Sequence, residues 1–286
     1  MFDEVADNAV LNQLKQNNYK IEYDNNCKSN RCAIYFSSHG IYYPETLENF
    51  SNVIVKKDYY EWYKTRVSGC HKHIFLRDII KQFYVEGINA NLNSIEKVIE
   101  FLKKETVGYE VICVGSSAGG YMAVIVGIAL EAKKIYSFSG KFSLRDDFAY
   151  DSKVKLLTHQ NDEYYSRYYN VLSMIESYSG EIVYVYPTES EEDLIQLALV
   201  KDRENIIKVP FAEKAHGVCM YPFCLKKFFD LSIDDVKSLL IEKEELNKVQ
   251  FSFELLGVKT LVYLLKYYYK KISVKILKYN IVHRGK

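Results

Sequence analysis

The chain has 286 residues, which allows one large domain or two small ones, and a hydrophobic content of 48% excludes a disordered protein. Its formal net charge of +1 provides no overall attraction to nucleic acid. The acidic N-terminus, MFDEVADNAV, lacks the basic-then-apolar pattern of a secretory signal, and no apolar run reaches membrane-spanning length. Six scattered cysteines without a C-x-x-C pair are typical of reduced core residues. We therefore expect a cytoplasmic protein.

Strand-like and helical patterns alternate along the chain. In chain order they predict a helix at 2–16, strands at 19–23, 31–36, 52–55 and 72–76, helices at 79–86 and 94–105, a strand and helix within 109–130, a strand at 134–138, a strand at 181–186, a helix at 191–200, a strand at 205–209 and a helix at 221–230. Most of these strands are apolar throughout, which indicates a mostly parallel sheet with helices on both faces, an α/β fold. We expect one catalytic domain over 1–230, with residues 141–178 as a cap above the carboxyl ends of the strands, and a helical extension over 231–286.

The stretch 109–130 carries the clearest chemical signal. An apolar strand ends in Gly115-Ser116-Ser117-Ala118-Gly119-Gly120, and an apolar helix follows at once. Strand, glycine-pinched turn and helix around a serine is the arrangement of a nucleophile elbow, in which small residues permit close contact between strand and helix. We expect Ser117 to be a nucleophile. The alternative is a glycine-rich turn that only packs, or that binds a phosphate.

A serine nucleophile requires a base that accepts its proton. Of the six histidines, His216 alone lies in the loop after the last predicted strand, where the base of such a site belongs. The neighbouring Gly217 allows the chain to bend back over the elbow. We expect His216 to be the base; the alternative is a histidine of a surface loop.

The acid that orients the base should follow the strand at 181–186. Four carboxylates lie there: Glu189, Glu191, Glu192 and Asp193. We favour Asp193, because a short side chain at the start of a helix is held rigidly. Glu189 and Glu191 remain alternatives.

An oxyanion hole requires two backbone N–H groups beside the nucleophile. We expect one from Ala118 and the other from the loop at 38–41, with Gly40 as the preferred donor and Ser38, His39 and Ile41 as alternatives. His39 and Arg77 are candidate substrate contacts. A structural role is the alternative for His39, and for Arg77 the alternative is an internal ion pair with Asp78 that fixes the loop. The sequence shows no metal-ligand spacing and no nucleotide-binding glycine motif, so we expect no metal and no cofactor.

The segments FSSHG at 36–40, GSSAGG at 115–120 and AHG at 215–217, with an acid near 193, resemble the α/β-hydrolase superfamily over 31–230. More loosely, the chain is similar to hydrolase-fold proteins of bacterial surface-polysaccharide biosynthesis. Its acid segment, PTESEED, departs from the pattern of better-known esterases. The resemblance implies a serine-dependent acyl ester hydrolase acting on a small ester or a glycan. The alternative is an O-acetyltransferase that uses acetyl-CoA as co-substrate on a polysaccharide, and a non-catalytic scaffold is less favoured.

The C-terminal tail differs in charge from the rest of the chain. From Val249 onward seven lysines and one arginine face the single acid Glu254, so that this segment carries +7. Lysines between apolar and aromatic residues over 251–286 predict a basic amphipathic helix, which suits contact with the anionic inner face of a membrane. The alternative is a helix packed on the sheet with solvated lysines. Nothing in the sequence indicates an oligomeric state.

Overall fold

The computed structural model describes residues 4–144, 162–241 and 243–284. In these residues one seven-stranded sheet runs in the order β1-β3-β2-β4-β5-β6-β7. Its strands are β1 (Tyr19–Tyr23), β2 (Arg31–Phe36), β3 (Lys72–Leu76), β4 (Glu110–Ser116), β5 (Lys134–Phe138), β6 (Ile182–Pro187) and β7 (Ile206–Phe211). The edge strand β1 is antiparallel to β3, and every other neighbouring pair is parallel. The predicted mostly parallel sheet is confirmed.

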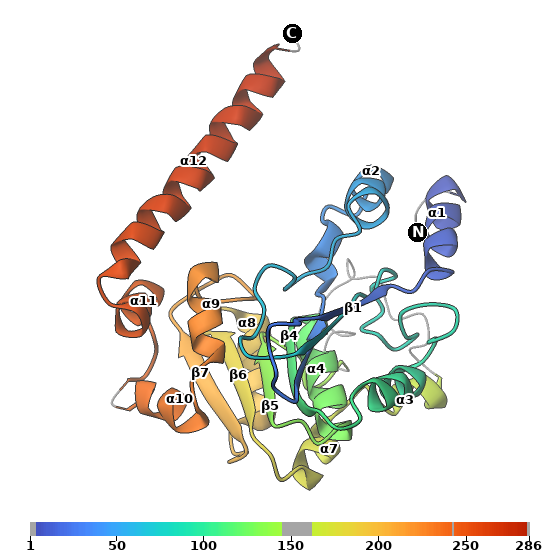
Figure 1. Cartoon of the computed structure of the whole chain (residues 1–286), viewed down its shortest axis with the longest axis horizontal. Coiled ribbons are helices and arrows are strands. Elements are labelled where there is room, and N and C mark those ends of the chain that lie inside the picture. The colour runs from blue at the N-terminus through green and yellow to red at the C-terminus, as the bar shows by residue number, and fades with distance from the viewer. Residues whose placement is uncertain (1–3, 145–161, 242, 285–286) are drawn as a thin grey trace.

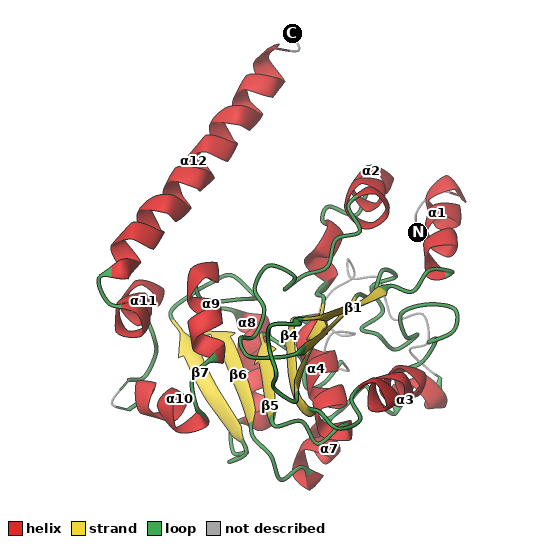
Figure 2. Cartoon of the chain, viewed as in Figure 1, coloured by secondary structure: helices red, strands yellow, loops and turns green. Residues whose placement is uncertain are grey.

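Helices cover both faces of this sheet (Figure 2). They are α1 (Glu4–Leu14), η1 (His39–Tyr42), α2 (Leu47–Phe50), η2 (Ser51–Lys56), α3 (Ile95–Glu105), α4 (Ala118–Ala129), α6 (Glu163–Ser166), α7 (Leu172–Ser177), α8 (Glu191–Val200), α9 (Pro222–Phe229), α10 (Ile233–Leu239), α11 (Lys248–Leu256) and α12 (Lys259–Arg284). Because successive side chains of a strand point to opposite faces, Ile34 and Tyr35 of β2 belong to two different core clusters. α3, α4 and α7 pack against the first cluster, and α9, α10 and α11 against the second.

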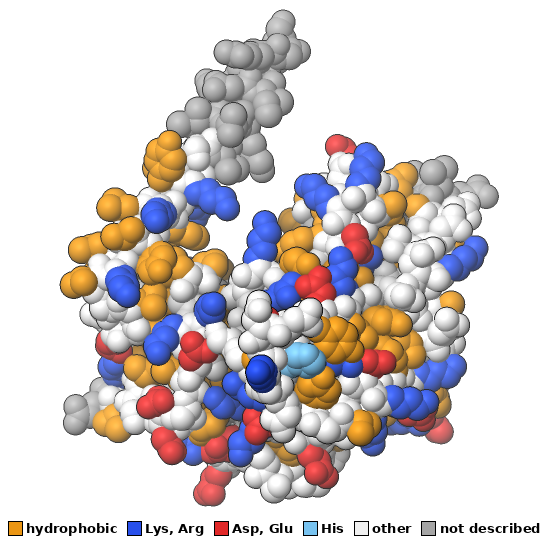
Figure 3. Space-filling model, viewed as in Figure 1, with side chains coloured by type: hydrophobic (Ala, Val, Ile, Leu, Met, Phe, Trp, Pro, Cys, Tyr) orange, Lys and Arg blue, Asp and Glu red, His pale blue; other side chains and the backbone are white. Residues whose placement is uncertain are grey.

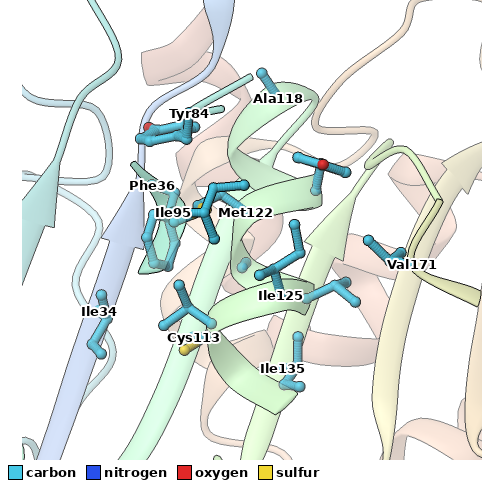
Figure 4. Packing of buried hydrophobic residues seen from close by; sticks show 14 of the residues in the cluster. Ile34, Phe36, Tyr84, Ile95, Cys113, Ala118, Met122, Ile125, Ile135 and Val171 are labelled. Atoms are coloured by element: carbon cyan, nitrogen blue, oxygen red, sulfur yellow. The ribbon is translucent and has the colours of Figure 1, made fainter. Parts of the chain in front are cut away.

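The helix α4 occupies the centre of the first cluster. Figure 4 shows Met122 and Ile125 of α4 against side chains of the sheet that include Cys113 and Ile135. Its residues from Ala118 to Gly127 are all buried, which explains why the sequence of this helix is apolar on every side. The element that carries the candidate nucleophile is therefore among the most firmly packed in the molecule. The cysteines agree with a reduced core, since all six are unpaired and all but Cys27 are buried.

The predicted strand at 52–55 is wrong. Thr46 caps α2 by accepting the N–H of Asn49, and the chain then continues as the π-helix η2. Phe50 and Ile54 lie four residues apart and are both buried in a third, smaller cluster with Val10. The β-branched residues of this segment thus belong to a helix, and one of its faces is buried.

The predicted helix at 79–86 is also wrong. The carboxylate of Asp78 accepts four backbone N–H groups of this segment, from Ile80, Lys81, Gln82 and Tyr84. Lys81, Phe83 and Tyr84 have positive φ angles, which a helix does not allow. One side chain therefore supplies the acceptors that a helix would have taken from its own carbonyls.

The segment proposed as a cap, 141–178, is described in part, and residues 145–161 lie outside the described residues. Tyr168 accepts a hydrogen bond at its carbonyl from the hydroxyl of Tyr121, near the start of α4. Further on, α7 packs on α4, and Ile175 is fully buried in the first core cluster. The portion at 172–177 therefore covers a face of the sheet and does not cap its edge.

The C-terminal extension forms three helices, α10, α11 and α12. Gly257, with φ +60, ends α11, so that the amphipathic stretch predicted from 251 onward is divided between two helices. Figure 1 shows α12 leaving the body of the molecule toward the C-terminus. None of the described helices combines the length and the hydrophobicity that a membrane span requires.

Candidate active site

Ser117 stands at the junction between β4 and α4 with φ 54 and ψ −121, a backbone conformation that costs a non-glycine residue about 1–3 kcal/mol. Its N–H donates to the carbonyl of Phe138 at 2.9 Å, which ties the turn to the neighbouring strand β5. A Cβ on Gly115 would lie 2.0 Å from the carbonyl oxygen of Gly119, and a Cβ on Gly119 would lie 2.2 Å from that of Phe36. Both glycines are therefore required for the close strand–helix contact, as the sequence predicts.

His216 lies in the loop after β7 and reaches Ser117. The distance between His216 Nε2 and Ser117 Oγ is 2.9 Å, and that between His216 Nδ1 and Asp193 Oδ2 is also 2.9 Å. The carboxylate of Asp193, in the first turn of α8, is 1% exposed and accepts a hydrogen bond from the hydroxyl of Ser190 at 2.6 Å. The structure thus brings the three residues of the predicted triad into one hydrogen-bonded line.

The loop that carries His216 is hydrogen-bonded to Ser139, the residue that follows β5. Gly217, with φ +117, donates its N–H to the hydroxyl oxygen of Ser139, and that hydroxyl donates to the carbonyl of Gly217, both at 3.0 Å. Ser139 itself has a positive φ of 47. Ser139 is a positioning residue that sequence reasoning missed, although the Ser139-Gly140 pair directly after a strand was a signal for it.

A second carboxylate, that of Glu192, also contacts the ring of His216. Its Oε1 lies 2.6 Å from His216 Nδ1, and the Glu192 side chain is half exposed. Burial lowers the pKa of His216, but hydrogen bonds and charge from Asp193 and Glu192 outweigh burial and raise this pKa to about 9. The hydrogen bond from His216 lowers the pKa of Glu192 to about 2. Among the alternative acids, Glu189 forms an ion pair with Lys214 at 3.5 Å.

The atoms of Glu192, Asp193 and His216 lie within 4.8 Å of one another, close enough for a shared cation. However, Nδ1 of His216 already forms a hydrogen bond with Asp193 and an ion-pair contact with Glu192, and its Nε2 faces Ser117. Hydrogen bonding accounts for the grouping, and the set does not need a metal ion.

The loop after β2 differs from its prediction. The N–H of Gly40 donates to the hydroxyl oxygen of Ser38 at 3.0 Å, where it caps η1, and Ile41 N–H donates to the carbonyl of Ser38. Ser38 N–H and hydroxyl both donate to the carboxylate of Glu61, at 2.7 and 2.9 Å. The choice of Gly40 as an oxyanion donor is therefore wrong, because its N–H is occupied. Of the four candidate donors, only the backbone N–H of His39 has no acceptor among the described residues.

The side chains of His39 and Arg77 lie in different surroundings. Nε2 of His39 accepts the N–H of Phe83 at 3.3 Å, and the ring packs edge-on against Phe83, with about a quarter of the side chain exposed. Arg77 is 1% exposed and donates to Asn18 and to the carbonyl of Tyr59, with Asp58 as its ion-pair partner at 3.0 Å. This burial leaves Arg77 no surface for a substrate contact. Arg77 does form an internal ion pair, but the expected partner is wrong: it is Asp58, while the carboxylate of Asp78 accepts backbone N–H groups.

No protein-family model and no curated protein sequence matches the chain. Among solved structures, the capsule O-acetyltransferase of Neisseria meningitidis serogroup A is similar with a TM-score of 0.50 and 16% identity, over 70% of this chain and 85% of that chain. MenH from S. aureus has a TM-score of 0.42 at 9% identity, over 79% of this chain and 99% of its own. A metagenomic α/β hydrolase from the Mar Chica lagoon has a TM-score of 0.45 at 10% identity, over 78% of this chain and 97% of its own. Likeness at such identity concerns the fold alone. With this sheet order and the strand–serine–helix junction, the chain has the α/β-hydrolase fold.

Proposed function

We propose that this chain is a serine-dependent acyl ester hydrolase of the esterase or deacetylase type. The observation that carries the proposal is the hydrogen-bonded line from Ser117 Oγ through the ring of His216 to the buried carboxylate of Asp193. A serine on a strained turn, with a base on one side and an acid behind that base, is equipped to attack an acyl carbonyl.

In the proposed reaction, Ser117 Oγ forms a bond to the carbonyl carbon while its proton passes to Nε2 of His216. The C–O bond to the leaving alcohol then breaks, and His216 returns the proton to that alcohol. A water molecule repeats the sequence on the acyl-enzyme and releases the acid. Asp193 holds the imidazole in the tautomer that accepts at Nε2, and Asp193 and Glu192 stabilise the imidazolium formed in between.

The negative charge on the carbonyl oxygen needs donors on the other side of Ser117. Ala118 is the first residue of α4, so its N–H has no acceptor within the helix and the helix dipole favours an anion there. The backbone N–H of His39 is the proposed second donor. The contact of Gly119 with the carbonyl of Phe36 supports this assignment, because it keeps the loop after β2 against the start of α4.

Acyl transfer to a glycan hydroxyl is the second candidate. It is favoured by the similarity of the fold to a capsule O-acetyltransferase, and it would use the same residues with acetyl-CoA as acyl donor. The two reactions differ only in whether water or a sugar hydroxyl reaches the acyl group.

A fluorophosphonate probe tests the nucleophile. We expect the wild-type protein to become labelled at alkaline pH and Ser117→Ala to lose all labelling. Ser116→Ala is the matched control, since it removes the neighbouring hydroxyl of the same turn and should keep its labelling. Labelling that persists in Ser117→Ala would overturn the assignment, and a wild-type protein that never labels would favour a non-catalytic scaffold.

Mass spectrometry separates the two reactions. The protein is incubated with acetyl-CoA and a panel of oligosaccharides, and glycans are examined for added acetyl groups. Acetylated glycan that depends on Ser117 would establish transfer. Rapid hydrolysis of p-nitrophenyl acetate without any glycan acetylation would leave hydrolysis as the function.

A further inference from the structure

The described side chains of α12 contact the body of the protein through the first turns of the helix. Thr260 is fully buried, and its hydroxyl donates to the carbonyl of Ser252 at 2.7 Å. Leu264 and Tyr267 pack against the second core cluster. Beyond these residues α12 extends away from the domain (Figure 1). One side of the helix is therefore engaged, and the other side is open along its described length.

The open side is apolar. Leu261, Leu265, Tyr269 and Ile272 follow one another at intervals of four, four and three residues, which places them on one face of the helix. They are 55%, 73%, 76% and 57% exposed. Figure 3 shows hydrophobic side chains along the described part of α12, with lysines beside them. We call these four residues the outer face of α12. Contiguous exposure of large apolar side chains is unusual for a soluble surface and marks an interaction site.

The charge of α12 has a single sign. Its 26 residues include six lysines and one arginine and no acid. Lys266 and Lys270 lie on one side of the outer face and Lys271 on the other, and all three are exposed. Among the residues that the structure describes, no carboxylate forms an ion pair with any of these three lysines. The positive charges of this helix are thus available to an external partner.

We propose that the outer face of α12 docks on an anionic membrane surface, with its apolar side chains among the acyl chains and its lysines at the headgroups. An apolar stripe between lysines is the pattern of helices that lie in a lipid interface. A second copy of the chain is a poorer partner, because α12 against α12 would bring two all-positive helices together without a compensating acid. A nucleic acid would match the lysines but offers no apolar surface to Leu265 and Ile272.

Docking at α12 has a defined relation to the candidate active site. The hydroxyl of Tyr268 lies 2.9 Å from that of Tyr221, and the rings of Tyr221 and Tyr267 pack edge-on. Tyr221 follows His216 by five residues in the segment after β7, at the carboxyl edge of the sheet. The docked helix would therefore lie at the edge of the molecule that carries Ser117. This proposal concerns binding alone and does not rest on the proposed reaction.

Flotation of the full chain with lipid vesicles tests the proposal. We expect binding to phosphatidylcholine vesicles that contain phosphatidylglycerol, little binding to phosphatidylcholine alone, and weaker binding as salt is added. The double variant L265E/I272E should bind vesicles with an affinity lower by about tenfold or more, because it puts two negative charges on the face that would enter the lipid. Val107→Glu is the control: Val107 is 78% exposed in the turn after α3, and replacing its apolar side chain by an acid there should leave binding unaltered.

Three outcomes would overturn the proposal. They are equal binding to neutral and anionic vesicles, unchanged binding of L265E/I272E, and a dimer of the wild-type chain that the double variant converts to monomers in light scattering. Circular dichroism of the variants verifies that they fold. Fluorophosphonate labelling of Ser117 should be the same with and without L265E/I272E, so failure of docking and failure of the proposed function are separate observations.

Discussion

Ser117 lies between two groups of carboxylates that do different work. On the side of His216, Asp193 and Glu192 both contact one imidazole nitrogen, and the hydrogen bond with His216 lowers the pKa of Glu192 to about 2. On the other side, Glu61 and Asp78 accept hydrogen bonds from neutral donors, mostly backbone N–H groups, and burial raises the pKa of Glu61. The first pair favours the protonated form of His216, and the second pair holds two loops in shape. The groups that donate hydrogen bonds to each carboxylate thus distinguish the two pairs.

Among substitutions in the two groups of carboxylates, Asp193→Asn should cause the largest loss of activity. The amide would favour the wrong imidazole tautomer, so we expect kcat/KM for p-nitrophenyl acetate to fall by about 10³–10⁴-fold with little change in thermal stability. Glu189→Gln serves as control, because this exposed acid pairs with Lys214 and should leave activity unchanged. An Asp193→Asn protein that kept a tenth of the activity would remove the acid role from Asp193.

Asp78→Asn should act on stability first. Its carboxylate is 1% exposed and accepts four backbone N–H groups, and the amide can serve only some of them. We expect a loss of about 3 kcal/mol in the free energy of unfolding, measured by urea denaturation. Asp234→Asn, an exposed acid in the first turn of α10, should cost much less. Equal losses in the two variants would contradict the structural role of Asp78.

Ser139→Ala tests how firmly the base must be held. Without the hydroxyl, the two hydrogen bonds to Gly217 are lost and the loop of His216 becomes looser. We expect kcat to fall by roughly tenfold with a similar KM, because the substrate is bound elsewhere and the proton transfer depends on orientation. Ser139→Thr keeps the hydroxyl and should restore part of the rate. A change confined to KM would mean that Ser139 contacts substrate.

Glu192→Gln should have the smallest effect on the maximal rate and a clear effect on its pH dependence. His216 must be neutral to accept a proton, and its pKa is about 9, so activity should rise about tenfold per pH unit up to that value. Removal of the Glu192 charge destabilises the imidazolium, so the rise should move to lower pH by about one unit and activity at neutral pH should increase. Glu191→Gln, one residue away, is the control for the pH profile. A profile unaltered by Glu192→Gln would show that Asp193 alone sets this pKa.

The same pKa difference affects folding. Since the folded pKa of His216 is raised above the ordinary value of 6.5, its contribution to stability is complete below about pH 6.5 and is lost as the pH rises through about 9. Thermal unfolding followed across this range should therefore show declining stability where activity increases.

The parts of the site that sequence predicts well are those encoded by a few neighbouring residues. The turn at Ser117 depends on Gly115 and Gly119, and the placement of His216 and Asp193 follows from their positions after successive parallel strands. The structure brings these side chains together, while their catalytic roles remain predictions. Glu192 is one of the four candidate acids but not a favoured one, because adjacent acids at a helix start are usually solvated, and only the position of the His216 ring brings this one into contact.

Two of the failures, those at Gly40 and Arg77, depend on partners distant in the chain. Gly40 is unavailable because Ser38 takes its N–H while Glu61, 23 residues away, holds Ser38. Arg77 is buried by Asn18, Tyr59 and Asp58. Local propensity favoured a helix after Asp78 and contained no sign that its carboxylate would bind the backbone there. Periodicity describes which face of an element is apolar, and it does not describe which acceptor a loop will find.

The order of the site residues along the chain has a consequence for biosynthesis. Ser117 belongs to the first half of the protein, while Asp193 and His216 follow β6 and β7, the last two strands. The ribosome therefore makes Ser117 before it makes the two side chains that form the hydrogen-bonded line with it. If the chain has the function proposed above, Ser117 would acquire its base only after β7, an edge strand, has been made and has joined the sheet. The last step of folding would then also be the step that completes the active site.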